Sequence, residues 1–503
     1  MKNILKNISI VVLFLFLAKF FSFIIELLIA SKFGVTNETD VYYMVTGIIQ
    51  VIYPMISIGI WKVFLPEYKE KISLGNKLAA NILTNKLICV FIVISITVMA
   101  IIILFPHFII KIFAPGFNET AILLAVPLIR ILSFMFIFNV LATFFSGILQ
   151  SNNQFAKSQF KEVIQHLPPI LYLLFGFGFA GLNGLTYVIV FGSFLSFFIE
   201  YIFVKKYYSF KMPKKMLDTN ILSVLKRVPI TCLNSIINQL NSIVDKAFAS
   251  SLTIGAVTCL NYGGKLVNLF DGLFSTAIST ALFPKIAELA VSKDKNKLKK
   301  FIKNYLIFVI SVITPLTAII LIFSKEIVII VFGRGKFDID AINTTSMVLL
   351  TYSIGLVAMS VTTIINDLFF ILKKTNTLLF TTIINIASNI ILDILFLQKH
   401  GVFALSLATT ISLYLSLGIK LYLLKNWIFF DKKLFNIFIF VFSSCLISAI
   451  PVCFFKTLNI DVLFLLIMGV LLFVTCYCVI LFGLNTYYRK KLFLLIYGTK
   501  ERK

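Results

Sequence analysis

Two opposite charges interrupt the first long apolar stretch of the sequence. The segment LFLAKFFSFIIELLIASKFG, residues 15–34, carries Lys19 and Glu26 between runs of apolar residues. A charged side chain at the centre of a membrane helix costs about 2.5–3.5 kcal/mol. Seven residues advance an α-helix by about 700° and about 10.5 Å, so the two charges share one face. We interpret this face as the wall of a hydrated cavity, in which Lys19 attracts an anionic ligand and Glu26 compensates Lys19 when the ligand is absent. A structural ion pair between helices is the alternative.

Further polar side chains lie inside apolar stretches later in the chain. Lys265 follows Gly263 and Gly264 in NYGGKLVNLF, and a glycine pair allows close approach to the backbone. We predict that Lys265 also faces a cavity, and the alternative is a lysine that extends to the membrane surface. Asp245 ends the amide-rich run NSIINQLNSIVD, in which Asn238 is a candidate donor either to sugar hydroxyls or to a neighbouring helix.

The composition requires a membrane to surround these residues. The chain has 503 residues, of which 59% are hydrophobic and 13% are charged. Its mean hydropathy is +1.00. A soluble domain has roughly 25% charged residues, and one globule cannot bury this much apolar surface. We therefore predict an all-α polytopic membrane protein.

Apolar runs long enough to span a bilayer recur along the whole chain and predict about fourteen transmembrane helices. They cover residues 8–31, 41–65, 79–104, 119–149, 160–178, 182–203, 220–250, 256–284, 301–324, 341–372, 375–397, 401–424, 434–456 and 461–484.

The positive charges predict the orientation of these helices. The formal net charge is +25, and the lysines gather in short loops such as KKYYSFKMPKKMLDTN and KDKNKLKKFIK and in the tail. Loops rich in lysine and arginine remain in the cytoplasm, so both termini are predicted to be cytoplasmic. The basic tail is interpreted as a membrane-surface anchor rather than an arm for nucleic acid.

An internal repeat divides the chain. ELLIASKFG, which begins at Glu26, resembles DKAFASSLTIG, which begins at Asp245, at an offset of 219 residues (245 − 26). FLPEYKE is echoed by LFPKIAE, and IFAPGF by VFGRGKF, in the same order. Parallel repeats of this kind are typical of transporters. We predict six-helix lobes at residues 1–215 and 216–430, followed by two additional helices and a basic tail at residues 431–503.

Little in the sequence indicates an enzyme or a bound cofactor. The seven cysteines lie in apolar runs without a CxxC pair, and His107, His166 and His400 show no ligand spacing. No P-loop is present. We predict no metal, no cofactor and no catalysis, although a membrane glycosyltransferase or polymerase is the enzyme class considered first.

Several longer motifs point to a family. ASKFGVTNETDVYY, FLPEYKE, IFAPGFNET, LNYGGKLVNLFDGLFSTAISTALFPKIAE and TYSIGLVAMSVTTIINDLFFILKKTNT resemble the MurJ/MviN lipid II flippases of the MOP superfamily. The resemblance implies two lobes around a central cavity in the bacterial cytoplasmic membrane. It also implies alternating access that moves an undecaprenyl-pyrophosphate-linked sugar, lipid II, from the inner to the outer leaflet. A monovalent cation or the membrane potential would drive it.

The resemblance also marks site residues. Family members use cavity cations on helices 1, 2 and 8, and Lys19 and Lys265 match two of these positions. Ile25 and Tyr53 stand at two further positions where the family has arginine. The family's acidic positions are matched by Glu26 and Asp40. Together with Asn238 and Asp245, these residues form the predicted substrate site.

Three other functions stay open at this point. The two missing arginines favour a flippase for capsule or other polysaccharide precursors within the same superfamily. A cation-coupled exporter of the MATE type shares the twelve-helix core, but its motifs are not seen. A structural membrane scaffold would leave the repeated intramembrane acids without a role.

Overall fold

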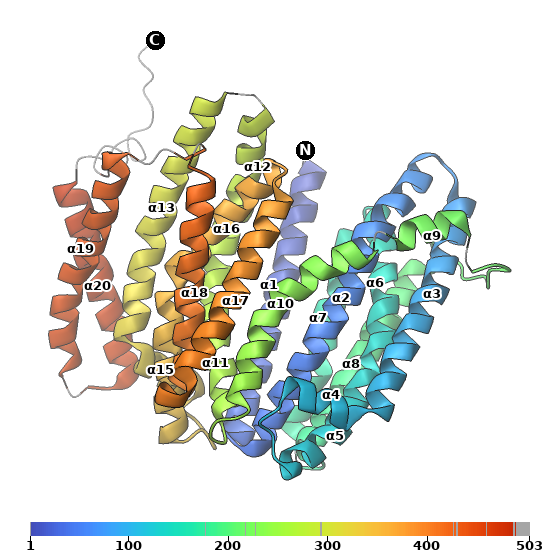
Figure 1. The fold of residues 1–503 in the computed structure, drawn as a ribbon, viewed down its shortest axis with the longest axis horizontal. Coiled ribbons are helices and arrows are strands. Elements are labelled where there is room, and N and C mark those ends of the chain that lie inside the picture. The colour runs from blue at the N-terminus through green and yellow to red at the C-terminus, as the bar shows by residue number, and fades with distance from the viewer. Residues whose placement is uncertain are drawn as a thin grey trace. The chain divides into compact units, whose positions relative to one another are not determined.

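The computed structural model describes residues 2–485 and 488, apart from residues 177, 217, 227, 292–293, 426, 429–430 and 459. These residues form twenty α-helices and two π-helical turns, and no strand occurs among them (Figure 1). The predicted all-α fold class is therefore confirmed.

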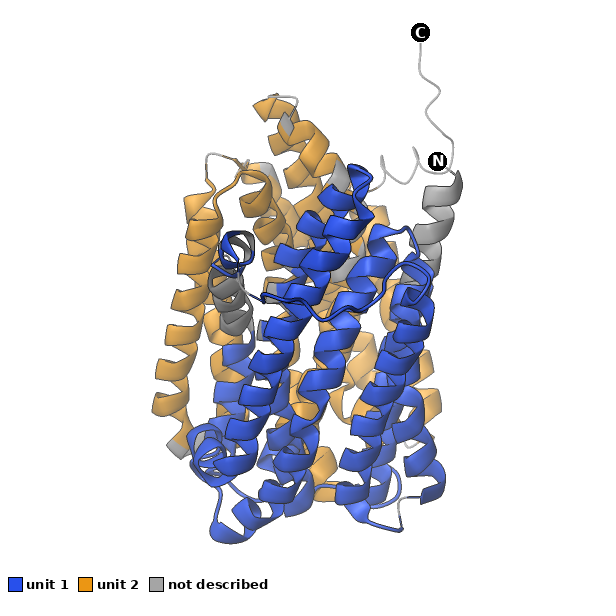
Figure 2. Cartoon of the chain, turned by 90° about the vertical axis from the view of Figure 1, so that its right-hand side faces the viewer, with its two compact units in different colours: residues 1–258, 334–338 blue, residues 259–333, 339–503 orange. Residues whose placement is uncertain are grey.

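The chain divides into two compact units, which are coloured separately in Figure 2. Unit 1 comprises residues 1–258 and 334–338, and unit 2 comprises residues 259–333 and 339–503. These units group residues by contact, so the predicted lobe boundaries at residues 215 and 430 stay a prediction.

Unit 1 contains the first ten α-helices and the first π-helical turn. They are α1 (Lys2–Phe33), α2 (Asn37–Ser73), α3 (Lys77–Leu104), α4 (Pro106–Phe113), α5 (Glu119–Ser133), α6 (Met135–Ser151), α7 (Phe155–Leu171), η1 (Tyr172–Gly176), α8 (Gly181–Val204), α9 (Thr219–Leu225) and α10 (Val228–Ala249). Within this unit α7 packs between α1 and α8, and α2 packs against α6 and α10.

Unit 2 holds the remaining helices. They are α11 (Ala256–Asp271), whose first three residues belong to unit 1, η2 (Gly272–Thr276), α12 (Ala277–Val291), α13 (Lys295–Ile322), α14 (Ser324–Phe332), α15 (Ile339–Ile354), α16 (Leu356–Ile371), α17 (Thr375–His400), α18 (Val402–Leu423), α19 (Lys432–Lys456) and α20 (Val462–Leu484). The pairs α17–α18 and α19–α20 pack as helical hairpins.

Local sequence signals set where helices begin and break. Thr36 caps α2: its hydroxyl accepts from the backbone N–H of Thr39, and the Thr39 hydroxyl accepts from the N–H of Thr36. In α7, Pro168 and Pro169 cannot donate backbone hydrogen bonds, and the helix gives way to the π-helical turn η1. Such breaks bring polar side chains and bent backbone into membrane-spanning segments.

The number of spans can be compared with the predicted fourteen. Among the described residues, nine helices are long and apolar enough to cross a membrane, or ten if α15 and α16, bent by 42°, form one span. The other predicted spans are also helical: α2, α7 with η1, α10, and α11 with η2 and α12. Since α7 and α11 are only 17 and 16 residues long, they span only together with the segments that follow them. The exact count of fourteen stays a prediction.

Candidate functional site

The first predicted acid, Glu26, lies in a polar cluster formed by α1, α2 and α10. Glu26 is 7% exposed, and its carboxylate accepts a hydrogen bond from the Tyr43 hydroxyl at 2.6 Å. Lys246 of α10 is also buried and donates from Nζ to the backbone oxygen of Tyr43 at 3.2 Å. Asp245, the predicted repeat counterpart of Glu26, is 3% exposed. The two acids are thus both buried inside unit 1, as a role in an interior polar site requires.

Lys19, seven residues before Glu26 on α1, is exposed in contrast. Its neighbours Phe16 and Phe20 are exposed as well. An exposed ammonium group on a membrane helix needs water or an anionic partner to solvate it. Its predicted contact with an anionic ligand stays a prediction.

Asp40 holds the start of α11 in place. Its carboxylate accepts hydrogen bonds from the backbone N–H of Gly255 (2.6 Å), the backbone N–H of Thr258 (2.8 Å) and the Thr258 hydroxyl (2.6 Å). A carboxylate at a helix N-terminus satisfies backbone donors that the helix leaves unpaired. The structure thus gives Asp40 a positioning role, and its predicted contact with a ligand stays a prediction.

Two turns of unit 1 each approach one of the repeated serines closely, and we call these two approaches the reciprocal turn contact. Gly116 donates its N–H to the Ser250 hydroxyl at 3.1 Å, and Lys336 donates its N–H to the backbone oxygen of Ser31 at 2.9 Å. The backbone of Gly335 approaches Ser31 about as closely as the backbone of Gly116 approaches residues 250–251. Both the glycines (335 − 116) and the serines (250 − 31) are 219 residues apart. The offset of the sequence repeat therefore has a counterpart in contacts between backbones.

Glycine is required where these backbones meet. A Cβ atom on Gly116 would lie 2.3 Å from the Ser251 Cα, and one on Gly335 would lie 2.1 Å from the Ser31 oxygen. Gly335 also has a φ of +65°, in the left-handed region. The turns that the sequence marked as IFAPGF and VFGRGKF are thus closely packed contact surfaces.

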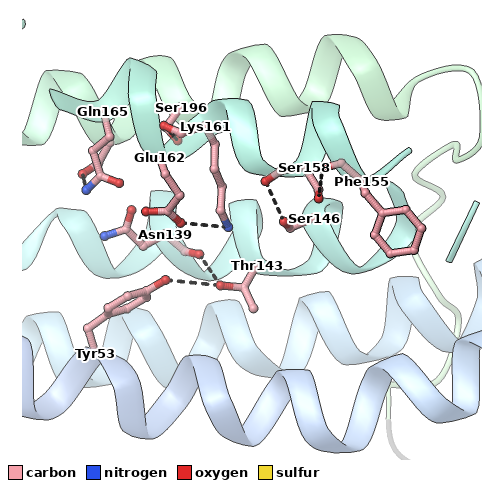
Figure 3. A network of polar contacts seen from close by, with 11 residues as sticks. Tyr53, Asn139, Thr143, Ser146, Phe155, Ser158, Lys161, Glu162, Gln165 and Ser196 are labelled. Carbon is pink, nitrogen blue, oxygen red and sulfur yellow. Dashed lines mark hydrogen bonds and ion pairs between the residues drawn. The ribbon is translucent and has the colours of Figure 1, made fainter. Parts of the chain in front are cut away.

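A second polar cluster surrounds α7 and is drawn in Figure 3. Lys161 and Glu162 point from α7 toward one another, with 4.0 Å between Nζ and Oε1. Their side chains are 14% and 41% exposed, respectively. Glu200 of α8 is fully buried and interacts electrostatically with Lys161. We call Lys161, Glu162 and Glu200 the α7 charge cluster.

Hydroxyl and amide groups from four helices lie around this cluster (Figure 3). The Tyr53 hydroxyl of α2 lies 3.4 Å from the Thr143 hydroxyl of α6. The Ser196 hydroxyl of α8 donates to the backbone oxygen of Lys161 at 3.2 Å. The amide of Gln165 donates to Ser193 at 3.4 Å. The charges are thus set in a polar interior layer of unit 1.

Sequence reasoning missed this cluster and Lys246. The signal was present: the segment KEVIQH, residues 161–166, puts four polar side chains into a predicted span, and Glu200 ends an otherwise apolar helix. Averaging hydropathy over a whole span hides such residues, because their apolar neighbours dominate the mean.

The polar residues of unit 2, of which Lys265 is the predicted site residue, are described separately. Lys265 of α11 is half-buried. Asp367 of α16 accepts a hydrogen bond from Ser279 at 2.5 Å, and Asn389 of α17 donates to Thr409 at 3.3 Å. Lys19 belongs to unit 1 and Lys265 to unit 2, so a cavity shared by the two lysines stays a prediction. The side chain of Asn238 lies outside the described residues.

The comparisons with known proteins decide the family. A family model described as "Lipid II flippase MurJ" matches residues 29–473. The chain belongs to the MurJ family.

Relatives of this MurJ-family chain match along nearly their whole length. A "Probable lipid II flippase MurJ" of Buchnera aphidicola subsp. Baizongia pistaciae is 26% identical over 484 residues, which cover 91% of this chain and 94% of the relative. A protein with the same description from Thermotoga maritima is 24% identical over 467 residues, covering 89% and 91%.

Solved structures share the fold of this MurJ-family chain. A structure described as "Lipid II flippase MurJ, inward closed conformation" aligns with a TM-score of 0.83 at 22% identity, covering 96% of this chain and 99% of that one. An inward-facing MATE transporter of the MOP superfamily aligns with a TM-score of 0.64 at 12% identity, covering 84% and 95%. The likeness shows a shared transporter fold, and the MurJ description is supported over the MATE alternative. This chain is a multi-pass transporter of the bacterial inner membrane.

Proposed function

We propose that this chain carries lipid II from the inner to the outer leaflet of the cytoplasmic membrane by alternating access. The observation that carries the proposal is the MurJ family match over residues 29–473. Transport requires no covalent chemistry by the protein, so we assign it no enzymatic activity. Buried acids and an exposed intramembrane lysine in unit 1 fit a site for a charged head group that must be released again.

The charge of the cargo indicates which residues of the proposed site would contact it. The pyrophosphate of lipid II is an anion with many acceptor oxygens, and a lysine ammonium binds it as a mobile point charge. We propose that Lys19 and Lys265 contact the pyrophosphate, while Glu26 lowers the electrostatic cost of the empty state. Asp40, Asn238 and Asp245 complete the proposed site. A monovalent cation or the membrane potential supplies the driving force.

Complementation tests the function. We expect the chain to restore growth of a bacterium depleted of its own lipid II flippase. The purified chain in liposomes is expected to move fluorescent lipid II between leaflets. Normal membrane abundance without growth or flipping would contradict the proposal.

A flippase for capsule or other polysaccharide precursors is the second candidate. Position 25 is isoleucine and position 53 is tyrosine, where the resemblance implies arginines. The Tyr53 hydroxyl lies beside Thr143 instead of presenting a positive charge. Liposomes that contain either lipid II or another undecaprenyl-pyrophosphate-linked sugar distinguish the candidates, because the true cargo is the one that is moved.

Membrane orientation gives a separate prediction. We expect both termini in the cytoplasm, since the lysine-rich segments would then lie inside. A phosphatase fused after Lys503 is expected to be inactive and a fluorescent protein at the same position to be bright. An active external phosphatase would reverse the proposed orientation.

A further inference from the structure

Glu200 is a fully buried carboxylate whose environment in unit 1 lacks hydrogen-bond donors aimed at it. Its exposed fraction is 0%, and neither carboxylate oxygen makes a hydrogen bond within the described residues. The Ser146 hydroxyl on α6 lies close to Glu200, and it donates to the backbone oxygen of Ser158 at 3.2 Å. A buried ionised carboxylate without such bonds costs several kcal/mol unless a positive charge compensates it.

The ammonium group of Lys161 is the positive charge near Glu200, and it interacts with two carboxylates, those of Glu200 and Glu162. Lys161 interacts electrostatically with Glu200, Glu162 and the Tyr53 hydroxyl. Its ammonium lies 4.0 Å from the carboxylate of Glu162, whose side chain is 41% exposed. Two carboxylates and one ammonium carry a net charge of −1 when all three are ionised. When Lys161 pairs with Glu162, the charge on Glu200 is left uncompensated in a dry interior.

Among the described residues, Lys161 is the cation that interacts electrostatically with Glu200, whereas Lys157, one turn earlier on α7, lies over the Phe203 ring of α8 at 5.6 Å from its centroid. On α7 the groups that face it are Lys161 and Glu162, on α6 the Ser146 hydroxyl, and on α2 Tyr53 through Lys161. Arg130 of α5 donates instead to the backbone oxygen of Ile103 on α3. The described residues also hold no group of three or more acidic, histidine or cysteine side chains suited to a metal ion. A proton can neutralise a buried carboxylate without any further ligand group.

We propose that Glu200 is a proton-binding site of unit 1, controlled by Lys161. The carboxylate takes a proton from water and becomes a neutral carboxyl while Lys161 pairs with Glu162. It releases the proton to water when the Lys161 ammonium turns to Glu200. Uptake or release of one proton at Glu200 is thus coupled to a change in the ion-pair partner of Lys161. This coupling does not depend on which cargo the chain carries.

Infrared difference spectroscopy tests the site on the purified full chain in lipid nanodiscs, without cargo. The carbonyl stretch of a protonated carboxyl is expected at pH 7 in the wild type and is expected to be lost in Glu200→Gln, which keeps the shape and removes the proton. Glu119→Gln, at an exposed position on α5, is the matched control and should leave the band unchanged. Identical carboxyl bands at pH 7 in the wild type and Glu200→Gln would overturn the proposal.

A second variant tests the control by Lys161. Lys161→Gln removes the competing positive charge but leaves Glu200 intact. We expect the pH midpoint of the same band to rise by roughly 1–3 units, the usual influence of a close opposite charge. An unmoved midpoint would exclude Lys161 as the controlling group. Since neither measurement involves lipid II, failure of the flippase proposal would not affect the outcome.

Discussion

Replacing Lys19 by alanine is expected to lower lipid II transport roughly 10- to 150-fold, because a charge-assisted hydrogen bond contributes about 1.5–3 kcal/mol. The side chain is exposed on α1, so its loss removes charge without opening a cavity in the helix packing. Lys19→Arg keeps the positive charge and is expected to retain much of the transport. Flipping of fluorescent lipid II by purified variants in liposomes measures both effects.

The matched control for Lys19 is Lys77→Ala. Lys77 is an exposed lysine at the start of α3, and its removal changes the net charge by the same amount. Transport should be unchanged in this variant. Normal flipping by Lys19→Ala at wild-type abundance would show that Lys19 does not contact the cargo, and Lys19 would then be a structural residue.

Adding a single methyl group at Gly335 is expected to disrupt the reciprocal turn contact. In Gly335→Ala the new Cβ would lie 2.1 Å from the Ser31 oxygen, so one backbone must move. Overpacking of this kind costs about 1–3 kcal/mol, which corresponds to roughly 5- to 150-fold in the population that makes the contact. Gly116→Ala, on the other copy, should have a similar effect.

Cysteine labelling measures this change. Ser250 is buried, so a cysteine in its place should react slowly with a maleimide. Gly116→Ala is expected to accelerate the labelling. Gly75→Ala is the control, because nothing lies within 4 Å of the Cβ position of Gly75. Equal labelling rates in Gly116→Ala and Gly75→Ala would show that the close packing at Gly116 does not stabilise the reciprocal turn contact.

Much of the fold could be predicted from the sequence because its signals are local or periodic. Apolar runs located the helices, and the echo of the Glu26 segment by the Asp245 segment gave the offset of 219 residues that reappears in the reciprocal turn contact. The burial of Glu26 and Asp245 agrees with their intramembrane positions. Each of these features can be recognised within the sequence of a single helix, or by comparing one part of the sequence with another.

The partners of the charged residues could not be predicted in the same way. Spacing along α1 placed Lys19 and Glu26 on one face, yet Glu26 accepts its hydrogen bond from Tyr43 of α2. Asp40 lies at the start of α2 but bonds to residues more than two hundred positions later. Interhelical partners depend on helix rotation and packing, which a single sequence does not specify without contact information.

The two approaches of the reciprocal turn contact have a consequence for the thermal stability of unit 1. When two separate contacts each hold part of a helical unit together, thermal opening of either one leaves the other closed. If the two open independently, the probability that both are open at once is the product of two small numbers. Unit 1 is thus held by redundant contacts, and the opening of one of them does not by itself separate its turns.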